Sequence, residues 1–294
     1  MYKIYADSCC DLTHDTAEKI GVSIIPLKYS IEDTEYVDNG KSTEEIISLY
    51  NQMRAGKNTR TSQPSPEEVE SIFEEAAKNN EELIYITVSS GISGTYNVSS
   101  MLLNNCKEKY PDAKIAVIDS LCASGGYGMF LHKAAEKRDS GLSFDELVDW
   151  ANEYRHNVIH WFTVDDLVYL LRGGRVSKAK AVIGGVLKLK PVMHVNEKGE
   201  LVPVGVARGR KNALRELVKN TLDDVAKYSK DNCPQSIHIN HADCIEDAEF
   251  CKKLLIEGCG IENIDITLIG PTIGSHSGPG TLAIYCMGNE REKK

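Results

Sequence analysis

The chain has 294 residues, 41% of them hydrophobic and 26% charged, which is typical of a globular protein and long enough for two domains. Its 34 Lys and Arg residues and 43 Asp and Glu residues give a formal net charge of −9, which argues against binding to nucleic acid or to an anionic membrane. The sequence offers neither a run of about 18 uncharged apolar residues for a membrane span nor a basic and apolar N-terminal leader, so we expect a cytoplasmic protein.

The first half of the chain alternates between strand and helix patterns. Strands are expected at residues 3–8, 23–29, 83–88 and 114–119, with helices at 13–20, 42–54, from 66 onward, 95–106 and 123–137. Pro26 indicates an edge or end position in the second of these strands. Strands that alternate with helices favour right-handed crossovers. We therefore predict a parallel sheet covered by helices on both faces, a three-layer α/β/α arrangement.

The second half has a different pattern. Residues 191–194 and 201–207 flank Asn196-Glu197-Lys198-Gly199, which is a β-hairpin signature. Further strands are expected at 236–242, 264–269 and 281–287, with helices at 212–228 and 245–257 and a glycine–proline loop around His276 between the last two strands. This order predicts a two-layer α/β domain with a mixed sheet. The domain boundary is expected between residues 155 and 165, which gives one domain at 1–160 and another at 161–294.

Three segments rich in Gly, Ser, Thr and Pro are expected at strand ends, at residues 61–65, 89–95 and 270–280. Ligands of open parallel sheets bind beyond the carboxyl ends of the strands, and the segment before residue 95 also opens a helix, which favours an anion. The hydroxyls of Thr61 and Ser93 and the imidazole of His276 are donors suited to a carboxylate or phosphate oxygen. Plain turns, where these residue types are common, are the alternative.

Other patterns give weaker signals. Arg172 and Arg175 flank Gly173-Gly174, and Arg208 lies beside two further basic residues; these groups could bind an anion or a partner, or simply be solvated. Ser93, His276 and Asp7 could form a nucleophile, base and orienting acid, but Thr95 stands where a nucleophile elbow has glycine.

No metal site is expected. The cysteines number nine and form no CxxC pair, which is typical of reduced thiols. His238 and His241 lie three residues apart in an expected strand, where such positions face opposite sides.

A series of motifs follows in order along nearly the whole chain. They include Thr-Ser-Gln-Pro-Ser at 61–65, Ser-Ser-Gly-Ile-Ser-Gly-Thr-Tyr at 89–96, Leu-Leu-Arg-Gly-Gly-Arg at 170–175 and Ile-Gly-Ser-His-Ser-Gly-Pro-Gly at 273–280, with shorter matches at 7–12, 25–27, 36–38, 117–120 and 190–191. Together they resemble the DegV family, bacterial lipid-binding proteins that include the acyl-carrying subunit of fatty acid kinase. Cys9-Cys10 stands where small residues are usual, and Ser275 and Ser277 where threonines are common.

The resemblance implies a non-catalytic, two-domain α/β protein that holds a long-chain fatty acid between its domains, needs no other cofactor, and presents the carboxylate to the catalytic subunit of a fatty acid kinase. It implies that Thr61, Ser93 and His276 hold the carboxylate. Their neighbours Ser62, Gly94 and Thr95 complete the predicted site. Arg172, Arg175 and Arg208 are the predicted docking points for the kinase. The alternatives are an acyl-ester hydrolase that uses Ser93 and His276, and a purely regulatory interaction protein.

Overall fold

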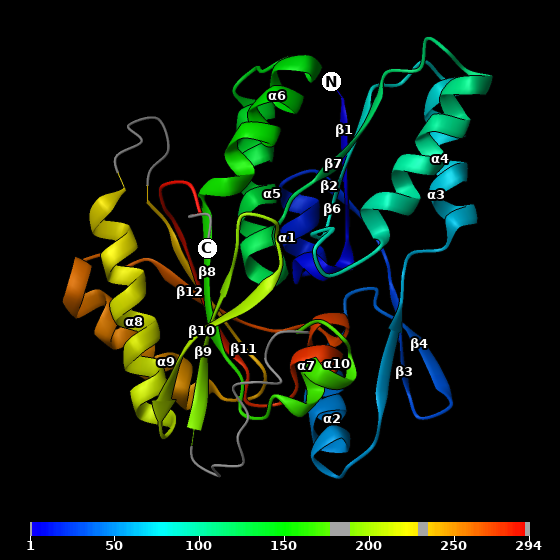
Figure 1. Ribbon diagram of the computed structural model, residues 1–294. Helices are drawn as coiled ribbons and strands as arrows, with labels where there is room; N and C mark the ends of the chain where they lie inside the picture. The colour runs from blue at the N-terminus through cyan, green and yellow to red at the C-terminus, as the bar shows by residue number, and fades with distance from the viewer. Residues whose placement is uncertain (1, 177–188, 229–234, 292–294) are drawn as a thin grey trace.

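Four parallel strands form the first sheet of the computed structural model, which describes residues 2–176, 189–228 and 235–291 (Figure 1). Their order is β2-β1-β6-β7. The strands are β1 (Lys3–Asp7), β2 (Val22–Ile25), β6 (Leu83–Thr87) and β7 (Ile115–Asp119). Every residue of β6 is buried, as expected for a central strand covered on both faces. The predicted parallel sheet is confirmed.

Helices cover both faces of this sheet. They are α3 (Pro66–Lys78) and α4 (Thr95–Lys109) on one face, and α5 (Ser124–Asp139) and α6 (Phe144–Tyr154) on the other, with α1 (His14–Lys19) beside β2. Successive residues of β6 point to opposite faces: Tyr85 packs with Phe73 of α3, and Ile84 lies in the cluster that contains Phe130 of α5. The result is the expected three-layer arrangement.

A second sheet has six strands in the order β10-β9-β8-β13-β11-β12. They are β8 (Val158–Thr163), β9 (Leu189–Val195), β10 (Leu201–Arg208), β11 (Ile237–His241), β12 (Ile264–Leu268) and β13 (Leu282–Met287). Only β11 and β12 pair in parallel among these described strands. Helices α8 (Arg210–Lys227) and α9 (Ile245–Cys259) pack on one face of the sheet (Figure 1). The predicted hairpin and mixed sheet are confirmed.

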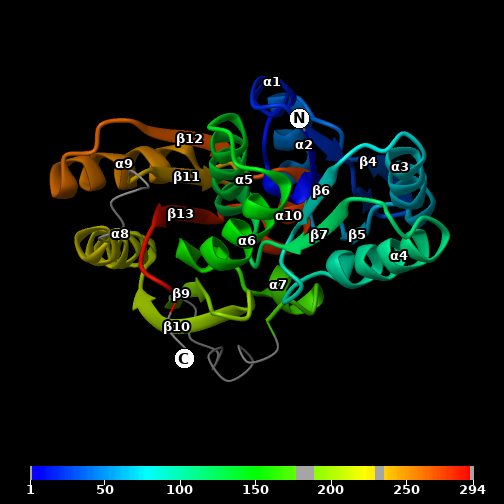
Figure 2. The ribbon, with the colours of Figure 1, turned by 90° about the horizontal axis from the view of Figure 1, so that it is seen from above.

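Helix α5 lies between the two sheets, as Figure 2 shows from above. Glycines make this position possible. A Cβ on Gly126 would lie 2.3 Å from Nε2 of His160 in β8, and a Cβ on Gly128 would lie 2.8 Å from the carbonyl oxygen of Cys10. Glycine costs about 1 kcal/mol in a helix interior relative to alanine, so its use here reflects the close approach of β8 on one side of α5 and of the turn that contains Cys10 on the other.

A third sheet, β4-β3-β5, is antiparallel and was not predicted. Its strands are β3 (Lys28–Ile31), β4 (Thr34–Val37) and β5 (Thr59–Ser62). The single strand expected at 23–29 is wrong because Pro26, which has no N–H to donate to a ladder, separates β2 from β3. Between β4 and β5, α2 (Thr43–Arg54) begins with a capping box formed by Ser42 and Glu45.

Four short helices complete the described elements: the 3₁₀ turns η1 (Ser8–Cys10) and η2 (Arg155–Asn157), and the α-helices α7 (Val168–Arg172) and α10 (Pro271–Ser277). The loop expected around His276 is therefore wrong, since that residue lies in α10. Pro271 starts this helix and Gly278, with φ 81°, ends it, as is usual for these two residue types. Within the described ranges, no helix combines the length and the apolar character needed to cross a membrane.

Candidate functional site

A cavity of about 790 Å³, its mouth included, is lined by residues from both halves of the chain. Much of the wall is apolar, with Leu27, Val88 and Ile92 from the first half and Phe162, Val195 and Leu201 from the second. Thr61, Ser93 and His276 line the same cavity. The fold thus brings together three side chains that lie far apart in the sequence.

His276 and Thr61 are in direct contact. Nε2 of His276, in the last turn of α10, lies 2.7 Å from Oγ1 of Thr61 in β5. The ring rests against the backbone of Gly173, where a Cβ would lie 2.4 Å from Nδ1. Burial, together with the positive charge of Arg175, lowers the pKa of His276 to about 4. The imidazole is therefore neutral at pH 7 and carries one N–H that can donate.

Ser93 lies just before α4, where Gly94 is the N-cap residue. Its Oγ accepts a hydrogen bond from the backbone N–H of Thr95 at 3.3 Å and lies 2.9 Å from the Thr95 hydroxyl. Thr95 is buried behind Ser93 and does not line the cavity, so its contacts orient the serine. Gly94 also lies outside the lining. It packs against the side chain of Gln63, because a Cβ on Gly94 would lie 2.5 Å from Nε2 of Gln63. Ser62 is exposed and away from the cavity.

Arg175, one of the predicted docking residues, is partly buried and lines the cavity. Its Nε donates to the carbonyl of Ile92 at 3.1 Å, and Nη1 donates to the carbonyl of Gly173. Both acceptors are neutral. Burial lowers the pKa of Arg175. In the described part of the chain no carboxylate contacts its guanidinium, so its charge is uncompensated. Its sequence signal was the pair of arginines, Arg172 and Arg175, that flank Gly173-Gly174. Arg172 and Arg208 are exposed.

Sequence reasoning also missed Ser277. This residue is buried, its side chain lines the cavity, and its Oγ has no hydrogen-bond partner within the described ranges. An unsatisfied buried hydroxyl is costly, and a ligand could satisfy it. Its position directly after His276 is the signal that could have identified it.

The residues proposed for the hydrolase alternative, Asp7, Ser93 and His276, do not contact one another in the structure. The carboxylate of buried Asp7 accepts hydrogen bonds from the backbone N–H groups of Val88 at 2.7 Å and Cys9 at 3.1 Å. His276 pairs with Thr61, and Ser93 with Thr95. Each member of the expected nucleophile, base and acid set therefore has a different partner, and this geometry does not favour a hydrolase.

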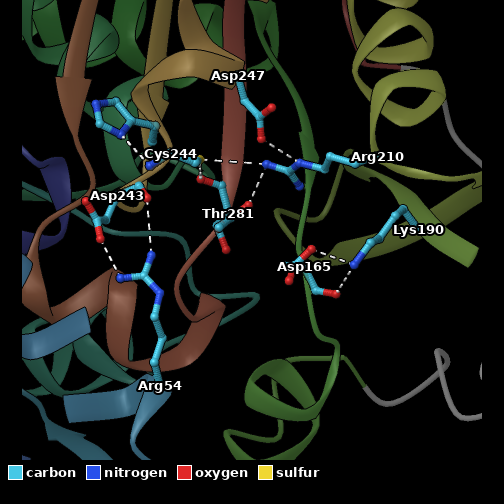
Figure 3. A network of polar contacts seen from close by, with 10 residues as sticks. Arg54, Asp165, Lys190, Arg210, Asp243, Cys244, Asp247 and Thr281 are labelled. Atoms are coloured by element: carbon cyan, nitrogen blue, oxygen red, sulfur yellow. Dashed lines mark hydrogen bonds and ion pairs between the residues drawn. The ribbon is translucent and has the colours of Figure 1, made fainter. Parts of the chain in front are cut away.

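Ion pairs surround the segment that follows α10 (Figure 3). Arg210 is more than a surface residue: its Nε donates to Asp247 at 2.8 Å, and its Nη2 donates to the carbonyl of Gly280 at 2.6 Å. On either side, Arg54 pairs with Asp243, and Lys190 pairs with Asp165. The bond to Gly280 holds the backbone just after α10, the helix that carries His276.

A family model described as "Uncharacterised protein, DegV family" matches residues 1–288. The chain belongs to the DegV family. Among curated relatives, a DegV domain-containing protein of Clostridium perfringens is 37% identical over 291 residues, covering 99% of both chains. One from Streptococcus pyogenes is 34% identical over 287 residues, covering 98% of both.

Solved structures of DegV proteins superpose over almost the whole chain. A DegV family protein from Thermus thermophilus, described by its fatty acid binding, has a TM-score of 0.85 at 28% identity and covers 98% of this chain and 99% of its own. A stearic acid-binding protein from Eubacterium ventriosum has a TM-score of 0.86 at 26% identity, with 98% of each chain covered. The DegV resemblance and the α/β fold that it implied are thus confirmed.

Proposed function

We propose that this protein binds one long-chain fatty acid in the cavity, with the carboxylate among Thr61, Ser93 and His276. The observation that carries the proposal is the cavity itself, which joins an apolar wall to a cluster of hydrogen-bond donors beside an uncompensated guanidinium. The fatty acid binding named for the DegV protein from Thermus thermophilus, and the stearic acid binding named for the one from Eubacterium ventriosum, support the same class of ligand.

The energetics agree with this ligand. Burying about 14 methylenes at roughly 0.8 kcal/mol each offers about 11 kcal/mol before the costs of association. Desolvating the carboxylate opposes binding unless charge-assisted hydrogen bonds replace its water. Arg175 supplies the positive charge, and Ser277 adds a hydroxyl without another partner. Thr95 then acts on the ligand through Ser93, which it orients, while Ser62 and Gly94 contribute as the chain neighbours of Thr61 and Ser93.

The proposal includes a non-catalytic role in which the carboxylate is presented to the catalytic subunit of a fatty acid kinase. Arg172 and Arg208 are exposed and are proposed as docking points for that subunit, while Arg175 is reassigned to the ligand. Nucleic acid is not a proposed partner. The free cysteines among the described residues fit a reducing, cytoplasmic location. We also propose the division into domains 1–160 and 161–294, which the change from the parallel to the mixed sheet supports.

Mass spectrometry of the purified protein tests this function. A free long-chain fatty acid extracted after denaturation, and present in smaller amount in a His276→Ala preparation, would support binding. Covalent acylation of Ser93 or turnover of acyl esters would favour the hydrolase, and neither result would favour a regulatory interaction protein. Formation of acyl phosphate from the loaded protein, a fatty acid kinase catalytic subunit and ATP tests the presentation step, with Arg208→Ala expected to slow it.

A further inference from the structure

One wall of the cavity is joined to its own sheet at few positions. Strand β9 pairs with β8 at two positions, Trp161 with His194 and Phe162 with Met193, and among the described strands β10 pairs only with β9. The β9–β10 hairpin continues beyond these pairs. Val195 and Leu201, which flank its turn, line the cavity. Sheet hydrogen bonds to β8 therefore do not hold this part of the wall in place.

The turn of the hairpin, residues 196–200, is called the tip below. Oδ1 of Asn196 accepts hydrogen bonds from the N–H groups of Lys198 at 3.0 Å and Glu200 at 2.9 Å. The Gly199 N–H donates to the carbonyl of Asn196 at 3.0 Å, and its φ of 72° suits glycine. These bonds make the tip a preformed unit that can move as one body.

The tip docks on the loop that leads to Ser93. The Ser89 hydroxyl donates to the carbonyl of Gly199 at 2.9 Å. The two backbones meet closely here, since a Cβ on Gly91 would lie 2.6 Å from the Gly199 carbonyl. The hairpin thus spans from its own sheet to the end of the parallel sheet, and its docking encloses the cavity beside Ser93.

Arg291 holds the tip from the other side. It is 4% exposed, and its Nη1 donates to the carbonyls of Leu121 at 2.7 Å and Asn196 at 3.2 Å. Its Nη2 donates to the carbonyl of Arg155 at 2.5 Å. One guanidinium therefore joins the tip to the loop after β7 and to η2. A neutral carbonyl is a weaker acceptor for a buried guanidinium than a carboxylate is. The value of burying Arg291 therefore lies in the three segments that it connects.

We propose that Arg291 is a positioning residue that latches the tip over the cavity and so sets the rate at which the fatty acid leaves. This inference rests on the proposed function. When the latch breaks, Val195 and Leu201 can move away from the ligand while the rest of the mixed sheet stays paired. Release of the ligand then requires only local opening of the hairpin. Local opening of this kind costs less free energy than global unfolding.

Transfer of radiolabelled stearate from the loaded protein to excess albumin measures this rate. Arg291→Met removes all donors to the three carbonyls, and we expect release at least ten-fold faster than from the parent. Arg291→Lys can still donate to one or two of them, so we expect an intermediate rate. Amide hydrogen exchange at the tip, measured without ligand, is expected to be slowest in the parent, faster in Arg291→Lys and fastest in Arg291→Met.

Arg138→Met is the matched control. Arg138 is also buried and donates to two backbone carbonyls, those of Gly21 and Ile20, at 2.7 and 2.8 Å, but it does not touch the hairpin. We expect it to lower the thermal midpoint while leaving stearate release unchanged. Equal release from Arg291→Met and Arg138→Met, or from Arg291→Met and the parent, would overturn the latch.

Two further results keep the test decisive. If Arg291→Met does not fold, Ser89→Ala removes the opposite contact of the tip and is expected to speed release by a smaller factor; no change there would also overturn the proposal. If the parent retains no stearate, the proposed function fails, whereas hydrogen exchange at the tip that is equal in parent and variant contradicts the latch alone.

Discussion

Asp38 and Thr272 are joined by two hydrogen bonds although they lie 234 positions apart in the chain. Oδ2 of Asp38 accepts from the backbone N–H of Thr272 at 3.2 Å and from its hydroxyl at 2.5 Å. Asp11 accepts from the N–H of the nearby Gly270 at 3.0 Å. Both carboxyls come from the first half of the chain and hold the start of α10. The position of His276 therefore depends on contacts across the whole fold.

Asp11 predicts a pH dependence of stability. Burial raises its pKa to about 8, so the folded state binds a proton that the unfolded state, with an ordinary pKa of about 3.9, releases. This contribution is fully present below pH 3.9 or so and is lost as the pH rises through about 8. Asp11→Asn cannot ionise, so its free energy of unfolding is expected to increase relative to the parent between pH 5 and 9. Denaturant titrations at several pH values measure the difference. Asp15→Asn, at an exposed position, is the control, and a difference independent of pH would contradict the assignment.

His276 is expected to contribute to affinity more than to folding. A hydrogen bond to a charged acceptor is worth about 1.5–3 kcal/mol, so His276→Ala should weaken stearate binding roughly ten- to a hundred-fold with little change in thermal midpoint. Ser93→Ala should weaken binding in the same direction, and the parent should show no hydrolysis of acyl esters. Fluorescence displacement and thermal unfolding give the two readouts. Unchanged affinity and midpoint in His276→Ala would remove this residue from the site.

Arg175 is expected to recognise the charge of the ligand. Arg175→Met should weaken stearate binding about ten- to a hundred-fold, but should change the affinity for stearyl alcohol much less, because the alcohol carries no charge. Competition binding with both compounds measures the contrast. Arg172→Met, at an exposed position, should affect neither. Equal losses for acid and alcohol would mean that Arg175 only shapes the cavity.

Gly126 tests the packing of α5. The Cβ introduced by Gly126→Ala would lie 2.3 Å from Nε2 of the buried His160, so the gain in helix propensity should be outweighed by overpacking of about 1–3 kcal/mol. Chemical denaturation measures the loss. Gly205→Ala is the control, since its Cβ would meet its nearest neighbour at 4.0 Å. A Gly126→Ala variant that is more stable than the parent would show that α5 and β8 can move apart to accommodate the added methyl group.

The sequence predicts those features of the fold that depend on local patterns. The alternation of buried strands with capped helices was sufficient to predict the parallel sheet. The turn sequence from Asn196 to Gly199 was sufficient to predict the hairpin. The third sheet was missed because Pro26 divides one apolar run between two sheets, which only pairing partners distant in the chain reveal. Helix α10 was missed because its glycine and serine content is typical of a loop, and tertiary contacts such as those of Asp38 override that preference.

The site was predictable to a similar degree. The three donors could be named from their segments, but the contact between Thr61 and His276 joins residues 215 positions apart and is set by how α10 packs against the third sheet. Arg175 carried a recognisable basic signal, yet nothing local tells whether a guanidinium turns outward or inward. That choice follows from the carbonyl of Ile92, which accepts its hydrogen bond.

The place of α5 between the sheets has a consequence for any attempt to divide the chain. A fragment that ends near residue 160 would keep α5 but would expose to water the side of the helix that faces His160 and Tyr285. The complementary fragment would expose the inner face of the mixed sheet. Neither piece could bury its apolar surface alone, so we expect calorimetry of the whole chain to record one cooperative transition and separately expressed halves to aggregate.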